Sequence, residues 1–141
     1  MKSQLIIYTD GGARSNPGPA AIGGQVLNDR QQAIYEFART IGVGTNNEAE
    51  YQSFLHSLSW LVDYQDQHQV NQVEWRLDSK LVVEQLNHHW KIKEPRLRTL
   101  ANQAWQELTK LTPTFQITHI PRTQNFRADQ LVNQALDNQE L

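Results

Sequence analysis

The sequence predicts an α/β protein with a mixed five-stranded sheet, in which three antiparallel strands are followed by two parallel strands and helices flank the sheet. Three apolar runs with short connections occupy the first 41 residues, which favours an antiparallel meander. Later strands alternate with helical segments, and helix crossovers imply parallel pairing. The 141 residues contain no internal repeat or interdomain linker, so we expect a single domain over residues 1–141.

The first predicted strand begins near Leu5 and ends at Asp10. Side chains alternate along a strand, so Asp10 shares a face with the large side chains of Ile6 and Tyr8. A carboxylate beside apolar side chains needs a polar or charged partner, which suggests a functional role. The structural alternative is an Asx-type turn, in which Asp10 bonds the backbone of the glycine-rich segment. Residues 11–20 are rich in glycine and proline and are expected to form a loop.

The second and third strands are predicted at residues 21–28 and 33–41, and Gly42-Val43-Gly44 is expected to interrupt the chain before a helix. Thr45 and Glu48 have the spacing of a capping box at the start of this helix. Apolar residues then recur at helical spacing. If Glu48 closes the cap, Glu50 is free for another task.

The second half of the chain is predicted to alternate strands and helices. A strand at residues 73–77 ends at Asp78, and Ser79 opens a helix that runs through Leu86. A helix at residues 95–110, a strand at 114–120 and a helix at 125–137 follow. Asp129 precedes apolar residues of the last helix by three and seven positions, so it leans toward the packed body.

Four carboxylates therefore lie at the ends of predicted elements: Asp10, Glu50, Asp78 and Asp129. Each alone has a purely structural explanation. Asp10 could form a turn and Asp78 a helix cap, while Glu50 could be a solvated helix residue and Asp129 could interact with the helix dipole. In a parallel α/β arrangement, however, the ends of strands and the first turns of helices share one rim. Converging carboxylates repel one another, and hard divalent cations such as Mg²⁺ or Mn²⁺ relieve that repulsion.

Composition excludes several classes of protein. The absence of cysteine rules out disulfides and thiolate metal sites. The first apolar run is too short for a membrane span or a signal peptide, so we expect a soluble, cytoplasmic protein with no membrane partner. The net charge of −2 is not typical of nucleic-acid binding through bulk charge. Phosphate contacts must then come from local patches, for which the candidates are Lys91, Lys93, Arg96 and Arg98, and Arg122 with Arg127.

Several blocks of the sequence together resemble type 1 ribonuclease H, from about Leu5 to Asp137. They are Tyr8-Thr9-Asp10-Gly11-Gly12, Asn16-Pro17-Gly18-Pro19, Thr45-Asn46-Asn47-Glu48-Ala49-Glu50-Tyr51, Asp78-Ser79, Pro121-Arg122, and Asn125 followed by Ala128-Asp129. The resemblance implies a ribonuclease H-like fold. It also implies hydrolysis of the RNA strand of RNA/DNA hybrids to 5′-phosphate and 3′-hydroxyl ends.

The resemblance assigns catalysis and metal binding to Asp10, Glu50, Asp78 and Asp129. The glutamate of this family lies three residues after the second asparagine of the Asn-Asn pair, which selects Glu50 and not Glu48. In the two-metal mechanism of the family, Asp10 would contact both Mg²⁺ ions. Glu50 and Asp78 would complete one site and Asp129 the other.

Substrate contacts are expected from small and amide residues that can read 2′-hydroxyls: Gly11, Gly12, Asn16, Asn46 and Asn47. Helix N-terminal chemistry is the alternative for the last two. The family often has a loop histidine before the last aspartate, and His119 fits by spacing. Its context also fits a half-exposed strand residue, and Arg122 is the competing phosphate-facing group.

One departure from the family affects substrate affinity. Some members carry a long basic protrusion between the two middle helices, whereas here only Asn87–Glu94 occupy that region. We therefore expect weaker or more salt-sensitive binding of the hybrid. No obligate protein partner is evident, so a monomer is expected. A catalytically silent nucleic-acid-binding domain and a related nuclease that cuts DNA are the alternative functions.

Overall fold

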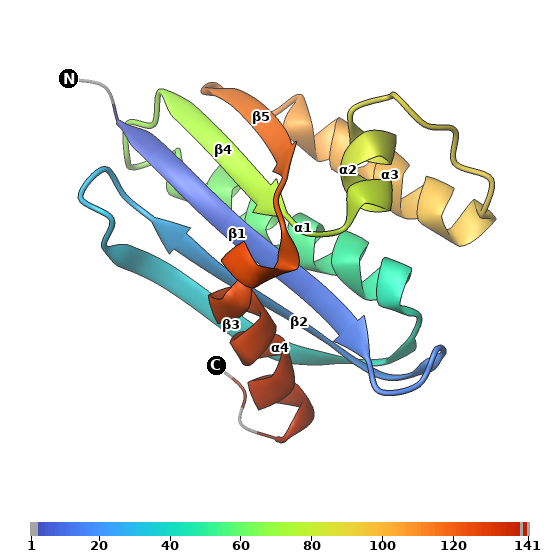
Figure 1. Cartoon of the computed structure of the whole chain (residues 1–141). Helices are drawn as coiled ribbons and strands as arrows, with labels where there is room; N and C mark the ends of the chain where they lie inside the picture. The colour runs from blue at the N-terminus through green and yellow to red at the C-terminus, as the bar shows by residue number, and fades with distance from the viewer. Residues whose placement is uncertain (1–2, 139, 141) are drawn as a thin grey trace.

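The computed structural model describes residues 3–138 and 140 and contains a five-stranded sheet in the order β3-β2-β1-β4-β5 (Figure 1). β2 is antiparallel to both β1 and β3, while β4 is parallel to β1 and to β5. The predicted mixed sheet is confirmed. Residues 1, 2, 139 and 141 of the expected domain lie outside the described residues, and the single domain stays a prediction. The elements are β1 (Gln4–Ala13), β2 (Gly18–Leu27), β3 (Ala33–Gly44), α1 (Asn46–Tyr64), β4 (Gln72–Leu77), α2 (Lys80–Leu86), α3 (Pro95–Leu108), β5 (Thr114–His119), a 3₁₀ turn η1 (Arg122–Gln124) and α4 (Phe126–Leu136).

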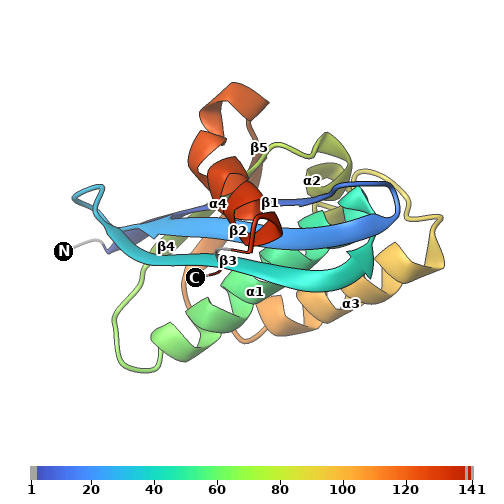
Figure 2. The same cartoon turned by 90° about the horizontal axis from the view of Figure 1, so that it is seen from below.

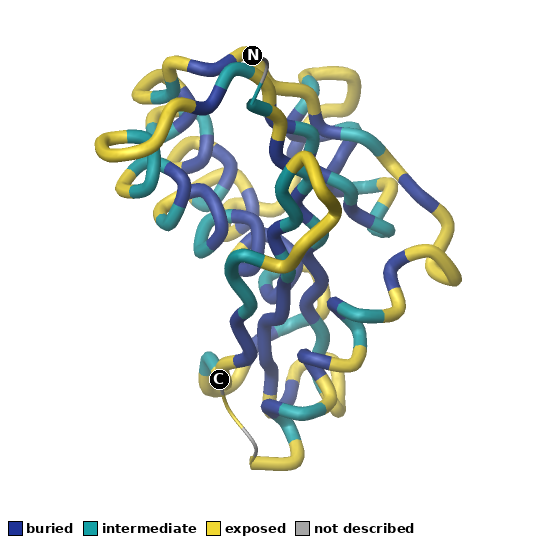
Figure 3. Tube along the Cα trace, turned by 90° about the vertical axis from the view of Figure 1, so that its left-hand side faces the viewer, coloured by how far each residue is buried: buried dark blue, intermediate teal, exposed yellow. Residues whose placement is uncertain are grey.

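Helices cover both faces of the sheet. α1 and α3 lie on one side of it and α4 on the other (Figure 2). The larger core lies on the α1 side, where the fully buried Trp75 of β4 packs with Phe54 and Leu58 of α1. Buried residues follow the central strands and the inner sides of the helices (Figure 3). The α4 side has a smaller core of Ala21, Ala38, Leu131, Val132 and Ala135.

The predicted loop at residues 11–20 is wrong, because most of it belongs to a hairpin. β1 continues through Gly11 and Gly12 to Ala13, and β2 begins at Gly18. At Gly11 a Cβ atom would lie 2.2 Å from the backbone of Ala49 in α1. This glycine therefore allows a helix to approach the strand and does not end the strand. Asp10 consequently lies within β1, opposite Gly23 of β2, and not at the strand end.

The third strand also runs further than predicted. β3 continues to Gly44, and its pairing with β2 shifts between Ala20, which faces Gly42, and Ala21, which faces Thr40. Ile41 is thus the extra residue of a β-bulge. Gly42 has φ of +82°, a conformation that glycine adopts without strain. Gly42, which was expected to interrupt the chain, instead accommodates the bulge, while Gly44 pairs with Gly18 of β2.

The beginning of α1 confirms the predicted capping box. The Thr45 hydroxyl accepts a hydrogen bond from the Glu48 amide at 3.1 Å, and the Glu48 carboxylate accepts one from the Thr45 amide at 3.0 Å. At α2 the Ser79 hydroxyl caps the helix by accepting from the Val82 amide at 3.3 Å. Both Glu50 and Asp78 are therefore free of helix capping. None of the helices in the described residues is long and apolar enough to cross a membrane.

The close contact between α4 and β2 leads to a stability prediction. A Cβ atom at Gly23 would lie 2.7 Å from the Ala128 carbonyl oxygen and 2.7 Å from the Val132 amide nitrogen. Gly23→Ala should therefore push α4 away from the sheet and lower the free energy of unfolding by about 1–3 kcal/mol in urea titrations. Gly44→Ala is the control, because the atom nearest to its added Cβ would be the Ala20 Cβ at 3.8 Å. Equal effects of the two substitutions would contradict the prediction.

Candidate active site

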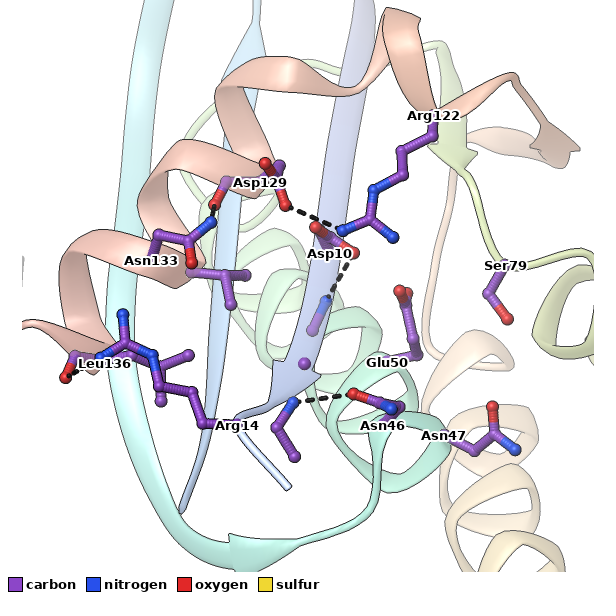
Figure 4. A pocket seen from close by; sticks show the side chains of 14 residues that line it. Asp10, Arg14, Asn46, Asn47, Glu50, Ser79, Arg122, Asp129, Asn133 and Leu136 are labelled. Carbon is purple, nitrogen blue, oxygen red and sulfur yellow. Dashed lines mark hydrogen bonds and ion pairs between the residues drawn. The ribbon is translucent and has the colours of Figure 1, made fainter. Parts of the chain in front are cut away.

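Three carboxylates from separate elements converge at one end of the sheet. Asp10, Glu50 and Asp78 each offer an oxygen atom, and these atoms lie within 4.8 Å of one another. Asp10 is 5% exposed and Glu50 is 6% exposed, so two of the three carboxylates are buried. Figure 4 shows the side chains of Asp10 and Glu50 in the same pocket. This is the only such group of metal-ligating side chains among residues 3–138 and 140.

Strand register and helix packing together produce this convergence. Thr9 of β1 pairs with Leu77 of β4 in the parallel ladder. Asp10 follows Thr9 and Asp78 follows Leu77, so the two aspartates occupy equivalent positions on adjacent strands. Side chains at equivalent positions of adjacent parallel strands lie side by side. Glu50 arrives from α1, whose backbone contacts β1 at Gly11, where a Cβ would lie 2.6 Å from the Glu50 amide nitrogen.

Asp129 approaches the same pocket from α4. It lines a cavity of about 340 Å³ together with Asp10, Glu50 and Arg122, but it is not part of the close group of three. Its Oδ1 atom accepts a hydrogen bond from Arg122 Nη2 at 3.4 Å. Figure 4 shows the Arg122 side chain extending from η1 toward Asp129 and Asp10. The Asp129 carboxylate thus lies at the more exposed side of the pocket.

Burial makes the charged state of these groups unfavourable. The pKa of Asp10 is raised to about 6, and burial is the main cause. The negative charges of Asp78 and Asp129 also raise it, while hydrogen bonds from the Glu50 carboxyl and the Gly11 amide lower it. Burial also raises the pKa of Glu50 well above its usual value, and the proximity of Asp10 contributes. The Glu50 Oε2 atom is buried without a hydrogen-bond partner. Either protons or a cation must therefore compensate the site at neutral pH.

Asn125 belongs to the site although it was not among the predicted site residues. It is 1% exposed, and its side-chain amide donates to the Asp78 carboxylate at 3.0 Å and to the Thr9 carbonyl at 2.9 Å. This amide holds Asp78 toward β1. Asn125 directly precedes α4, so its side chain would ordinarily be expected to cap that helix. Local spacing does not distinguish the two uses, and the family motif that contains Asn125 was the one sequence signal for a role in the site.

The predicted substrate-contacting residues fall into two groups. Gly11, Gly12, Asn46, Asn47 and Arg122 line the pocket. Asn16 does not line it. Its Oδ1 accepts from the Asn46 amide at 2.9 Å, and Asn46 Oδ1 in turn accepts from the Ala13 amide at 2.8 Å. These bonds connect the β1–β2 hairpin to the beginning of α1.

Two further predicted groups lie away from the pocket. His119 ends β5, is exposed, and does not line the carboxylate pocket, so its role in catalysis stays a prediction. Arg127, expected to form a phosphate-binding patch with Arg122, instead forms two hydrogen bonds with Glu36 of β3. Arg127 therefore already has a carboxylate partner, and its contact with phosphate stays a prediction.

This sheet, with carboxylates delivered to one place by β1, α1 and the end of β4, defines a ribonuclease H-like protein. Residues 8–135 match the family described as "Reverse transcriptase-like". Ribonuclease HI of Halobacterium salinarum is 40% identical over 130 residues, which are 92% of this chain and 63% of that protein. The bifunctional protein Rv2228c of Mycobacterium tuberculosis is 38% identical over 95% of this chain and 36% of its own length. The chain therefore spans less than two thirds of these relatives.

A solved ribonuclease H structure is similar to this chain in both fold and sequence. LC11-RNase H1 in complex with RNA/DNA hybrid superposes with a TM-score of 0.90 at 40% identity, covering 95% of this chain and 97% of that chain. The chain belongs to the type 1 ribonuclease H family.

Burial of Asp10 predicts an unusual pH dependence of stability in the metal-free protein. The folded-state pKa of about 6 exceeds the unfolded value of 3.8, so between these pH values only the unfolded state releases the proton. Stability should then fall as pH rises toward 6 and stay lower above it. Asp10→Asn should raise the free energy of unfolding by about 1–3 kcal/mol at pH 8 with chelator present, and the gain should vanish below pH 4. Asp66→Asn, at an exposed turn, controls for loss of one negative charge; an equal gain there would contradict the prediction.

The bonds of Asn125 lead to a second prediction about the site. Asn125→Asp has the same shape but places a carboxylate oxygen where the amide donated to Asp78 and Thr9. We expect the free energy of unfolding at pH 7 to fall by about 1–3 kcal/mol. The loss should shrink in acid, where the new carboxyl group can donate. Asn102→Asp, exposed on α3, is the control, and urea titrations that find the two variants alike would refute the assigned bonds.

Proposed function

We propose that this chain is a metal-dependent endoribonuclease that hydrolyses the RNA strand of RNA/DNA hybrids to 5′-phosphate and 3′-hydroxyl products. The observation that carries the proposal is the group of three carboxylates within 4.8 Å, two of them buried and unfavourable in the charged state without a cation. The likeness to LC11-RNase H1, whose structure contains an RNA/DNA hybrid, supports the choice of substrate.

The donor set fits two Mg²⁺ ions, or Mn²⁺ in their place. All of the candidate ligands are carboxylates, which hard divalent cations prefer, and the chain contains no cysteine. Asp10, Glu50 and Asp78 would hold one ion, and Asp10 with Asp129 would hold the other. Such ions, when bound, supply Lewis acidity toward the scissile phosphate and neutralise the carboxylates.

The chain's own residues orient the reaction. Asn125 holds Asp78 toward β1, so this carboxylate stays at a defined place even in the absence of a cation. Arg122 lines the pocket with a 78% exposed side chain, and we propose that it would face the scissile phosphate. Electrostatic attraction there requires that its weak bond to Asp129 be exchanged for one to the substrate. His119 is proposed to assist proton transfer from the end of β5.

Selection of RNA depends on the backbone and amide groups beside the carboxylates. Gly12, Asn46 and Asn47 line the pocket and present small or amide groups to a bound strand. Amide groups donate and accept hydrogen bonds, as recognition of a 2′-hydroxyl requires. Asn16 acts from outside the pocket through its bond to the Asn46 amide. The protein is proposed to act as a monomer on the hybrid duplex, with no membrane partner.

A catalytically silent nucleic-acid-binding domain fits the site less well. Without cations, the carboxylates of the pocket would repel a phosphate backbone. Binding alone gives no reason to bury Glu50 with an unpartnered oxygen beside Asp10.

Cleavage of matched duplexes tests the proposal. The wild-type chain should cut the RNA strand of an RNA/DNA hybrid with Mg²⁺ or Mn²⁺, and chelator should stop it. Asp10→Asn and Glu50→Gln should lower the rate by roughly a thousandfold or more, since several kcal/mol of transition-state stabilisation are lost. Glu48→Gln is the control. Glutamine can also complete the capping box with Thr45, so this variant should retain most of the activity.

The results of this experiment distinguish the proposed ribonuclease from a silent binding domain and from a nuclease that cuts DNA. Binding of the hybrid without metal-dependent cleavage would support the silent domain and overturn the enzyme, and cleavage of a DNA/DNA duplex alone would support the related nuclease. Near-normal turnover by Asp10→Asn would remove Asp10 from the proposed mechanism.

A further inference from the structure

α4 carries Asp129 but packs on a sheet surface made of small residues. Ala21 and Gly23 of β2 and Ala38 of β3 lie beneath it, and Gly23 leaves no room for a Cβ atom. Such residues allow a helix to come close to the sheet. They offer no large side chains that interlock with the helix, so they set the height of α4 above the sheet better than its position along the sheet.

An ion pair fastens the first turn of this helix to the edge strand. Arg127 Nε donates to Glu36 Oε2 at 2.8 Å, and Arg127 Nη2 donates to Glu36 Oε1 at 2.7 Å. Gln25 of β2 donates to the same Glu36 carboxylate at 2.7 Å. Two parallel bonds from a planar guanidinium group restrict both distance and orientation. The side chains of Arg127 and Glu36 are only 36% and 22% exposed, which limits screening by solvent.

The charge state of Glu36 agrees with a persistent pair. The Arg127 guanidinium lowers the pKa of Glu36, and the bond from Gln25 acts in the same direction against burial. The opposite side of the first turn is held by Asn125, which bonds Thr9 and Asp78. Asp129 follows two residues after Arg127, so its backbone is held between an anchor on β3 and an anchor near the carboxylates.

We propose that the Glu36–Arg127 pair is a positioning device that places Asp129 relative to Asp10 for phosphodiester cleavage. This inference rests on the proposed function. Neither Glu36 nor Arg127 lines the carboxylate pocket, so the pair acts through the backbone of α4 and not by touching substrate. A displacement of about 1 Å in a catalytic group can lower a rate about 100-fold, so a small shift of α4 is sufficient.

A double-mutant cycle on Glu36→Gln and Arg127→Gln tests the pair. Rates are measured on the RNA/DNA hybrid with Mg²⁺ at a temperature well below the unfolding transition of every variant. Each single variant should lower kcat roughly tenfold, with KM within about twofold of wild type. The double variant should be no worse than the worse single variant, because the two residues act as one unit.

Asp137→Asn is the matched control at the other end of α4. It breaks the Arg14–Asp137 pair, whose side chains are 46% and 59% exposed, and should leave kcat unchanged. Wild-type kcat in both single variants, multiplied losses in the double variant, or an equal loss in Asp137→Asn would each overturn the positioning role. The last result would mean that any weakening of α4 has the same effect.

A Mg²⁺ titration of the substrate-free protein by amide NMR gives a readout that does not depend on turnover. In wild type, the amides of Asp10 and Asp129 should both respond to Mg²⁺. In Arg127→Gln the response at Asp129 should weaken while that at Asp10 persists. An unchanged response at Asp129 would overturn the inference. A wild type that fails to cleave the hybrid would overturn the proposed function, while this titration would still decide the role of the pair.

Discussion

The close approach of α1 to β1 at Gly11 is the constraint on which the rest of the site depends. Only hydrogen on the Gly11 Cα atom fits against the backbone of Ala49, and this contact places the next helical residue, Glu50, against Asp10. A Cβ atom at position 11 would lie 2.2 Å from the Ala49 backbone, so a larger residue there would push helix and strand apart. The two carboxylates would then no longer share one buried space.

That contact has an energetic consequence. Burial raises the pKa of both Asp10 and Glu50, so the site opposes folding at neutral pH unless protons or cations compensate it. The large core on the same face of the sheet, with Trp75 buried against Phe54, supplies apolar burial that offsets such a cost. The arrangement is expected where a rigid scaffold holds groups whose preferred state depends on a bound ion.

The two faces of the sheet hold the site in different ways. On the α1 side, large interlocking side chains and a capping box determine where Glu50 lies. On the α4 side, the packing surface is small, and polar bonds from Asn125 and Arg127 take over the task of setting position. Asp129, unlike Asp10 and Glu50, is not buried, and its carboxylate has a 3.4 Å bond to Arg122.

Periodicity and local spacing determined much of this protein from sequence alone. Apolar alternation and helical spacing predicted the mixed sheet, and the Thr45–Glu48 spacing predicted a capping box that the structure confirms. These features succeed because they depend on neighbours within a few residues. Because Glu48 closes the cap, Glu50 could be distinguished from Glu48 by spacing alone. The roles of Gly11 and Gly42 could not be predicted, because a glycine that permits close packing or a bulge has the same sequence signature as one that makes a turn.

Only the tertiary structure decided which side chains share partners. Asn125 occupies the position of a helix cap, but its side chain bonds Asp78. Arg127 was expected to contact phosphate, and its side chain bonds Glu36. These partners lie 47 and 91 residues away along the chain. Sequence spacing specifies the face of an element on which a residue lies. The group that meets it there depends on how the elements are packed.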